Sequence, residues 1–185
     1  YRANLIPSPF QIYSRLVSTA NNSSDIMAKS LAIKTKGENE TNSVKRFFSS
    51  MIRVPDGMQG WIANIAIDGY RILRRHKIDT FITSGPPMST HVGGLLLKII
   101  TGVKWVADFR DPWTHGPRWK QDRYRTRLSD NLEKWLESRV VGEADLVISV
   151  GPRITEYFKS KLPINQHGKC VTIANGFDES DFDGI

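Results

Sequence analysis

Two short segments of the chain combine residue types that could hold a polar or anionic substrate. The first is Ser84 to His91, in which a glycine and two prolines separate a β-branched, aromatic run from an apolar helical pattern. Gly85 permits close backbone approach, and Pro86 stiffens the turn. We expect Ser89 to cap the following helix, whose free amides attract anions and keep His91 neutral. The alternative is a rigid turn with a capping serine and a surface histidine.

The second segment, residues 107–113, places three charged residues directly after another apolar run. They are Asp108, Arg110 and Asp111. Charges at a strand end are costly to bury unless they pair or bind a ligand, and the planar guanidinium of Arg110 suits phosphate or carboxylate. Two interpretations stay open: an Arg–Asp network that braces the loop, or side chains that hold a polar ligand.

The residues around these segments alternate between two periodic patterns. Apolar spacing typical of helices and short apolar runs typical of strands follow each other four times. We expect helices near residues 58–77, 89–101, 122–142 and 152–158, and strands near residues 78–84, 104–109, 145–150 and 169–174. The third helix is expected to bury one face made of Leu128, Leu132, Trp135, Leu136 and Val140.

This alternation predicts an α/β fold: a Rossmann-like parallel sheet with helices on both faces. The sheet begins on a helix, so we expect its first part to be incomplete in these residues. Ligands of such sheets bind beyond the carboxyl ends of the strands. That rule selects the two segments above, the loop from Ser149 to Arg153, which we interpret as a structural turn, and the turn that begins at Asn175.

Composition narrows the classes of function. The single cysteine, Cys170, excludes an internal disulfide and favours a reducing compartment, so we expect a cytoplasmic protein. The net charge of +7 includes a basic, aromatic run from Arg118 to Arg127, which is either a solvated face or a peripheral membrane contact. No nucleic-acid-binding motif is present. The four histidines lack metal-ligand spacing, and we expect neither a metal nor a cofactor.

Several runs of this sequence together resemble a known enzyme family. They are Thr83-Ser-Gly-Pro-Pro-Met-Ser-Thr-His, Lys104-Trp-Val-Ala-Asp-Phe-Arg-Asp-Pro-Trp, Glu143-Ala-Asp and Ile173-Ala-Asn-Gly-Phe-Asp. From about Pro55 to Phe182 the chain resembles the N-terminal domain of glycosyltransferase family 4 enzymes of the GT-B fold, in a bacterial subgroup linked to surface polysaccharide synthesis. In many members of this family a histidine follows the strand that corresponds to residues 104–109. This chain has Arg110 and Asp111 at that place.

The resemblance implies a retaining transfer of a sugar from a nucleotide-sugar to a saccharide or lipid-linked acceptor, without a metal. This domain would shape the acceptor side, a C-terminal domain would grip the nucleotide, and the domain alone would be inactive. The expected catalytic residues are Arg110, Asp111 and His91, and the expected substrate-binding residues are Ser84, Gly85, Pro86, Asp108, Trp113 and Asn175. The alternatives are a non-catalytic α/β binding module and part of a GT-B sugar-nucleotide epimerase.

The same features predict a division of the chain into three parts. We expect a polar, partly flexible segment over residues 1–50 and the Rossmann-like domain over residues 51–174. Residues 175–185 would begin the crossover to the C-terminal domain. The turn-rich polar composition of the first segment is the basis of the first boundary.

Overall fold

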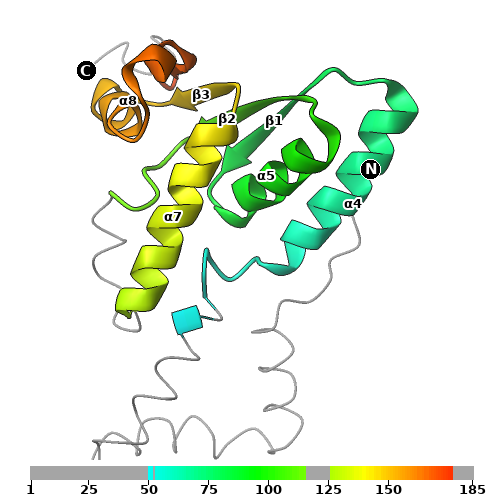
Figure 1. Ribbon diagram of the computed structural model, residues 1–185, viewed down its shortest axis with the longest axis horizontal. Helices are drawn as coiled ribbons and strands as arrows, with labels where there is room; N and C mark the ends of the chain where they lie inside the picture. Colours follow the sequence, from blue (N-terminus) through cyan, green and yellow to red (C-terminus); the bar gives the residue numbers. More distant parts are fainter. Residues whose placement is uncertain (1–49, 52, 116–125, 177–185) are drawn as a thin grey trace, which may run out of the picture.

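The computed structural model describes residues 50–51, 53–115 and 126–176. Their centre is one parallel sheet whose four strands are adjacent in chain order (Figure 1). The strands are β1 Thr80–Gly85, β2 Lys104–Phe109, β3 Leu146–Ser149 and β4 Cys170–Thr172. The predicted Rossmann-like α/β class is therefore confirmed, in a form consistent with a GT-B N-terminal half.

Helices alternate with these strands as the apolar spacing predicts. They are α4 Gly60–His76, α5 Ser89–Thr101, α7 Arg127–Glu143 and α8 Pro152–Lys159, followed by the 3-10 helix η2 Ile164–Lys169. Gly102 ends α5 with a φ of 68°, a left-handed conformation that glycine adopts without strain. No helix in the described residues is long and apolar enough to cross a bilayer.

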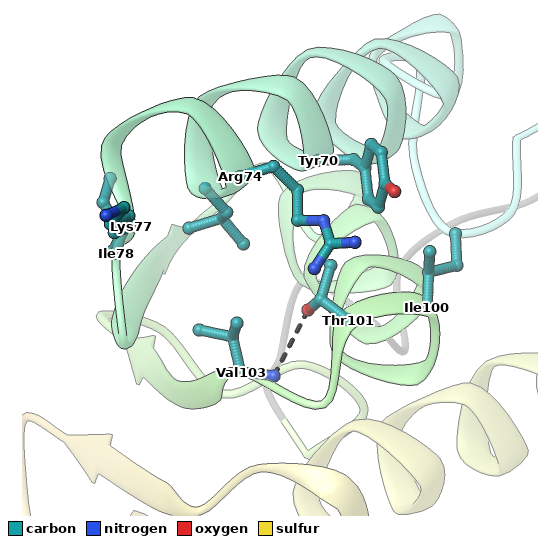
Figure 2. Close-up of a pocket in the computed structure, with 8 residues that line it drawn as sticks. Tyr70, Arg74, Lys77, Ile78, Ile100, Thr101 and Val103 are labelled. Carbon is teal, nitrogen blue, oxygen red and sulfur yellow. Dashed lines mark hydrogen bonds between the residues drawn. The ribbon is translucent and has the colours of Figure 1, made fainter.

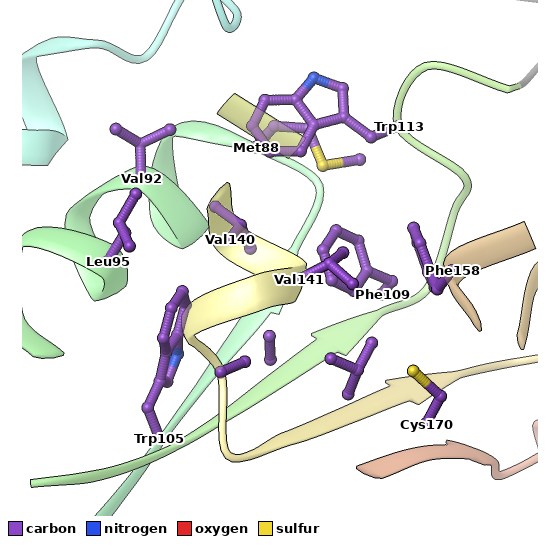
Figure 3. Close-up of a cluster of buried hydrophobic side chains, with 13 residues drawn as sticks. Met88, Val92, Leu95, Trp105, Phe109, Trp113, Val140, Val141, Phe158 and Cys170 are labelled. Atoms are coloured by element: carbon purple, nitrogen blue, oxygen red, sulfur yellow. The ribbon is translucent and has the colours of Figure 1, made fainter. Parts of the chain in front are cut away.

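The crossover helices α5, α7 and α8 pack on the same face of the sheet. Their apolar side chains enclose one core with Val147. Trp105 and Phe109 of the same core point from the strands toward the helices (Figure 3). Consecutive right-handed crossovers between strands in the order β1-β2-β3-β4 all proceed in one direction, so they place their helices on one side. Cys170 is buried in this core, where burial raises the pKa of its thiol, as expected of a structural cysteine.

The opposite face of the sheet is not covered by a helix of the described residues. Strand residues alternate in burial, and the side chains on that face, such as Ile82 and Asp108, are exposed or partly exposed. The expectation of helices on both faces is met for one face within this part of the chain. Helix α4 lies beside α5 (Figure 1), where Gly93 makes room for Ile65 and Gly69 for Leu97.

The predicted buried face of α7 is only partly confirmed, since Val140 is buried and Leu136 packs against the core, but two of its other members are exposed. Leu128 and Trp135 lie on the exposed side of this helix, whereas Glu133 and Glu137 are buried with Val140. The leucine spacing indicated an apolar core face, but the polar partners of Glu137 sit on the core side and hold the helix in a different rotation. The consequence is an apolar exposed face on α7 and a buried carboxylate beneath the sheet's carboxyl edge.

Candidate functional site

The loops that follow β1 and β2 meet at the carboxyl edge of the sheet, as the sequence predicts. The main chain joins them, because the amide of Arg110 donates to the carbonyl oxygen of Gly85 at 3.0 Å. Side chains near the ends of the two strands are joined as well, since the Ser84 hydroxyl donates to Oδ2 of Asp108 at 2.7 Å. The parallel register places Ser84 beside Asp108 and Gly85 beside Phe109. Three predicted substrate-binding residues thus form one group.

Arg110 and Asp111 extend beyond this group into solvent. Both are exposed, and within the described residues neither side chain forms a hydrogen bond or an ion pair. No ion pair links Arg110 to Asp108 or Asp111, so the bracing Arg–Asp network is not formed among these three residues. A free guanidinium and a free carboxylate on a strand-end loop are available to contact a sugar hydroxyl or a phosphate.

His91 lies inside the domain, beneath the loop that follows β1. It is fully buried on α5, its ring packs 4.2 Å from that of Phe109, and burial lowers its pKa to about 3. The surface-histidine alternative is therefore wrong, and the imidazole is neutral at physiological pH. The expected neutral state arises from burial among apolar groups.

Thr83 links His91 to the sheet. The Thr83 hydroxyl oxygen accepts from Nε1 of Trp105 at 2.9 Å and forms a second hydrogen bond, 2.9 Å long, with Nδ1 of His91. The other ring nitrogen of His91 is Nε2. That Nε2 has no partner in the described residues and faces Gly85, where a Cβ would lie 2.6 Å away. Glycine is required at position 85 because the imidazole fills the space of a side chain.

The turn between β1 and α5 is compact. The bonds Gly85–Pro86 and Pro86–Pro87 are both cis. Pro86 is exposed, whereas Met88 is buried against the core. The turn therefore presents the expected substrate-binding residue Pro86 to solvent while it fixes the start of α5.

The N-terminus of α5 carries an internal anion. The predicted cap, Ser89, is instead the first helical residue, and its amide and hydroxyl donate to the carboxylate of Asp56 at 2.8 and 2.5 Å. The amides of the next two residues bond to the carbonyl oxygens of Pro87 and Met88. The expectation that a phosphate binds here is wrong, because a carboxylate of the same chain already occupies the first free amide.

Trp113 belongs to the core and not to the surface of the loop. It is buried against Met88, and its Nε1 has no partner among the described residues (Figure 3). The structure thus separates Trp113 from Arg110, although only two residues lie between them. Asn175, which follows β4, is exposed. Of the basic run of residues 118–127, only the last two residues belong to the described part of the chain.

A buried polar network under the β2 loop escaped the sequence analysis. The carboxylate of Glu137, fully buried on α7, accepts from the amide and hydroxyl of Thr114 at 3.1 and 2.5 Å, from the Tyr157 hydroxyl at 2.9 Å and from Nζ of Lys161 at 2.8 Å. His115 stacks on Tyr157 at 4.4 Å. This network fastens the end of the β2 loop to α7 and α8 and so fixes where the loop's exposed charges stand.

The network shifts the pKa values of its members. Burial raises the pKa of Tyr157. Burial by itself lowers the pKa of Lys161, but its contacts with Glu137 and Tyr157 together hold that pKa above the ordinary value. The Lys161 ammonium therefore stays charged at neutral pH, 2.8 Å from the Glu137 carboxylate.

Comparison with known proteins identifies the family. The sequence model described as Glycosyltransferase Family 4 matches residues 35–181, which is most of the chain. No curated protein matches the chain. The matched range contains both strand-end loops and all four strands.

Proposed function

The chain belongs to glycosyltransferase family 4, and we propose that it forms the acceptor side of a retaining enzyme that transfers a sugar from a nucleotide-sugar. The acceptor is a saccharide or a lipid-linked saccharide, as in bacterial surface polysaccharide synthesis. The observation that carries this proposal is the pair of exposed charges on the loop after β2, Arg110 and Asp111, which have no partner among the described residues.

Each group has a distinct part in the proposal. The guanidinium of Arg110 donates hydrogen bonds to acceptor oxygens, and the carboxylate of Asp111 accepts from an acceptor hydroxyl. The Ser84–Asp108 pair joins the ends of β1 and β2 on the face of the sheet that no described helix covers. The His91 ring lies under the loop that follows β1, and its contact with Gly85 fixes the position of the backbone there. Trp113 supports the loop by filling the core.

A second domain completes the enzyme in this proposal. It grips the nucleotide, so the 185 residues alone bind acceptor but transfer nothing. No metal takes part in this proposal, as the family resemblance implies. Asn175 lies at the start of the connection to that domain.

The test compares sugar transfer by the complete protein and by its Arg110→Ala variant, with nucleotide-sugars as donors. Loss of a charge-assisted hydrogen bond should lower kcat/KM by about 10- to 100-fold. The matched control is Arg139→Ala, which removes an exposed arginine of α7 that pairs only with Glu143 among the described residues. Equal transfer by both variants, with the fold intact, would remove Arg110 from the site.

A further inference from the structure

The outer side of the helical layer carries more than half of the large exposed apolar side chains of the described residues. Helices α4, α5 and α7 lie side by side, with α5 in the middle (Figure 1). We name as the outer helical surface the exposed residues Ile67, Tyr70, Leu96, Ile99, Ile100 and Trp135. Isolated exposed apolar residues need no explanation, but a group on one side of a domain marks an interaction surface.

Helical geometry keeps these side chains away from the core. On α5, Leu96, Ile99 and Ile100 follow the spacing of one helical face, and Gly94 on the other side packs against Trp105 of the sheet. Ile99 remains 59% exposed although the core beneath is filled. On α7, Trp135 is 57% exposed because Glu137 faces inward. Large parts of the apolar side chains of this surface, from 39% of Tyr70 and Leu96 to 59% of Ile99, therefore stay exposed among the described residues.

A basic cavity of about 400 Å³ adjoins this surface between the last turns of α4 and α5. Figure 2 shows the Arg74 side chain extending between Tyr70 and Thr101, and the guanidinium lies 5.8 Å from the centre of the Tyr70 ring. Lys77 and Ile100 also line the cavity. None of its lining residues is acidic, and neither cation forms an ion pair within the described part of the chain. The cavity therefore offers two uncompensated positive charges beside apolar side chains.

We propose that the outer helical surface docks on an anionic lipid bilayer, with Arg74 and Lys77 at the lipid phosphates. Tyrosine and tryptophan are the aromatic residues that favour the membrane interface, and aliphatic side chains such as Ile99 enter its apolar part. Cations beside an anionic leaflet add attraction that a neutral bilayer lacks. This combination distinguishes a lipid surface from a purely apolar protein partner.

The docking surface lies apart from the candidate site but shares an element with it. The β1 loop precedes the first residue of α5, and the cavity lies at the helix's last residue, Thr101. The 13 residues of α5 span about 20 Å at 1.5 Å per residue. A bilayer along this helix would leave Arg110 at the edge of the docked face, within reach of an acceptor anchored in lipid. This inference concerns where the protein sits and stands without the proposed chemistry.

The test is sedimentation of the protein with vesicles of phosphatidylcholine alone and of phosphatidylcholine with phosphatidylglycerol. We expect binding to the anionic vesicles only, weakened by added salt because the attraction is screened. Ile99→Asp and Arg74→Glu should each reduce this binding about tenfold. The matched control is Ile164→Asp, on η2 at the far edge of the sheet, where the side chain is 85% exposed; it should bind like the wild type.

Three results would overturn the proposal. The first is equal binding of the protein to neutral and anionic vesicles. The second is unchanged vesicle binding by Ile99→Asp and Arg74→Glu together with lost vesicle binding by Arg123→Glu. That result would assign the membrane contact to the basic run of residues 118–127. The third is evidence that protein, and not lipid, covers the outer helical surface. That evidence would be a large fall in the melting temperature of Ile99→Asp, or a dimer of the wild type that Ile99→Asp abolishes. An unchanged melting temperature with lost vesicle binding supports docking on lipid.

Discussion

Replacement of Glu137 by leucine should strongly destabilise the domain. The variant leaves the Thr114 amide without its acceptor and the Lys161 ammonium, whose side chain is only 14% exposed, without its carboxylate. An orphaned buried donor costs about 1–3 kcal/mol and a broken buried ion pair about 3–5 kcal/mol. The hydroxyls of Thr114 and Tyr157 retain each other at 2.8 Å, and leucine adds apolar contact. We therefore expect a loss of about 3–5 kcal/mol.

Urea denaturation followed by tryptophan fluorescence measures this loss. For a chain of this size it corresponds to a fall in melting temperature of roughly 10 °C. Glu156→Gln is the control, because Glu156 pairs with Lys159 while 69% exposed, and such surface pairs contribute less than about 1 kcal/mol. A Glu137→Leu variant within about 1 kcal/mol of the wild type would refute the assigned role of the network.

Two further measurements sharpen the attribution. Glu137→Leu combined with Lys161→Met removes both charges, so it should recover much of the lost stability. Because the pKa of Lys161 is raised above its ordinary 10.5, the stabilisation is complete below that pH and is lost as the pH rises through the folded-state value. The difference between wild type and Glu137→Leu should therefore shrink only in strong alkali, and a difference lost near neutral pH would contradict the ion pair.

Three other substitutions test the carboxyl edge of the sheet. Gly85→Ala should lower the free energy of unfolding by about 1–3 kcal/mol because its Cβ would meet His91, whereas Gly142→Ala, with open space around it, should raise it by about 0.5–1 kcal/mol; equal effects in denaturant would contradict the packing. Because burial lowers the pKa of His91 to about 3, only the unfolded chain takes up this proton below its ordinary 6.5. Stability should therefore fall by about 1.4 kcal/mol per pH unit in acid, and His91→Gln, compared in a denaturation series, should remove that part of the slope. Asp56→Ala should cost about 1–2 kcal/mol, since the Ser89 amide loses its acceptor; an unchanged melting temperature would show that the cap is dispensable.

The fold could be predicted because its signals are local. The strand Lys104–Phe109 and the helix Ser89–Thr101 have the predicted bounds, since short apolar runs and 3.6-residue spacing reflect burial directly. The meeting of the β1 and β2 loops follows from the parallel order alone. What could not be predicted is which side chains of those loops point outward, because that depends on packing under the loop.

The misassigned residues share one physical cause. Their partners lie far away in the sequence. Asp56 caps a helix that begins 33 residues later, and Glu137 holds Thr114, 23 residues before it. A carboxylate within a leucine-rich helix normally indicates the solvent side, so the buried position of Glu137 had no local signal. The Glu133 and Glu137 pair, one turn apart on α7, was the only hint of a polar inner face.

The kinetic constants of Arg110→Ala test the central claim most directly. They should be measured in the complete protein with the acceptor and the nucleotide-sugar varied in turn. If the β1 and β2 loops form the acceptor side, the KM for the acceptor should rise about tenfold or more while the KM for the donor stays near the wild-type value. A rise confined to the donor KM, or no change in either, would contradict the assignment of this edge to the acceptor.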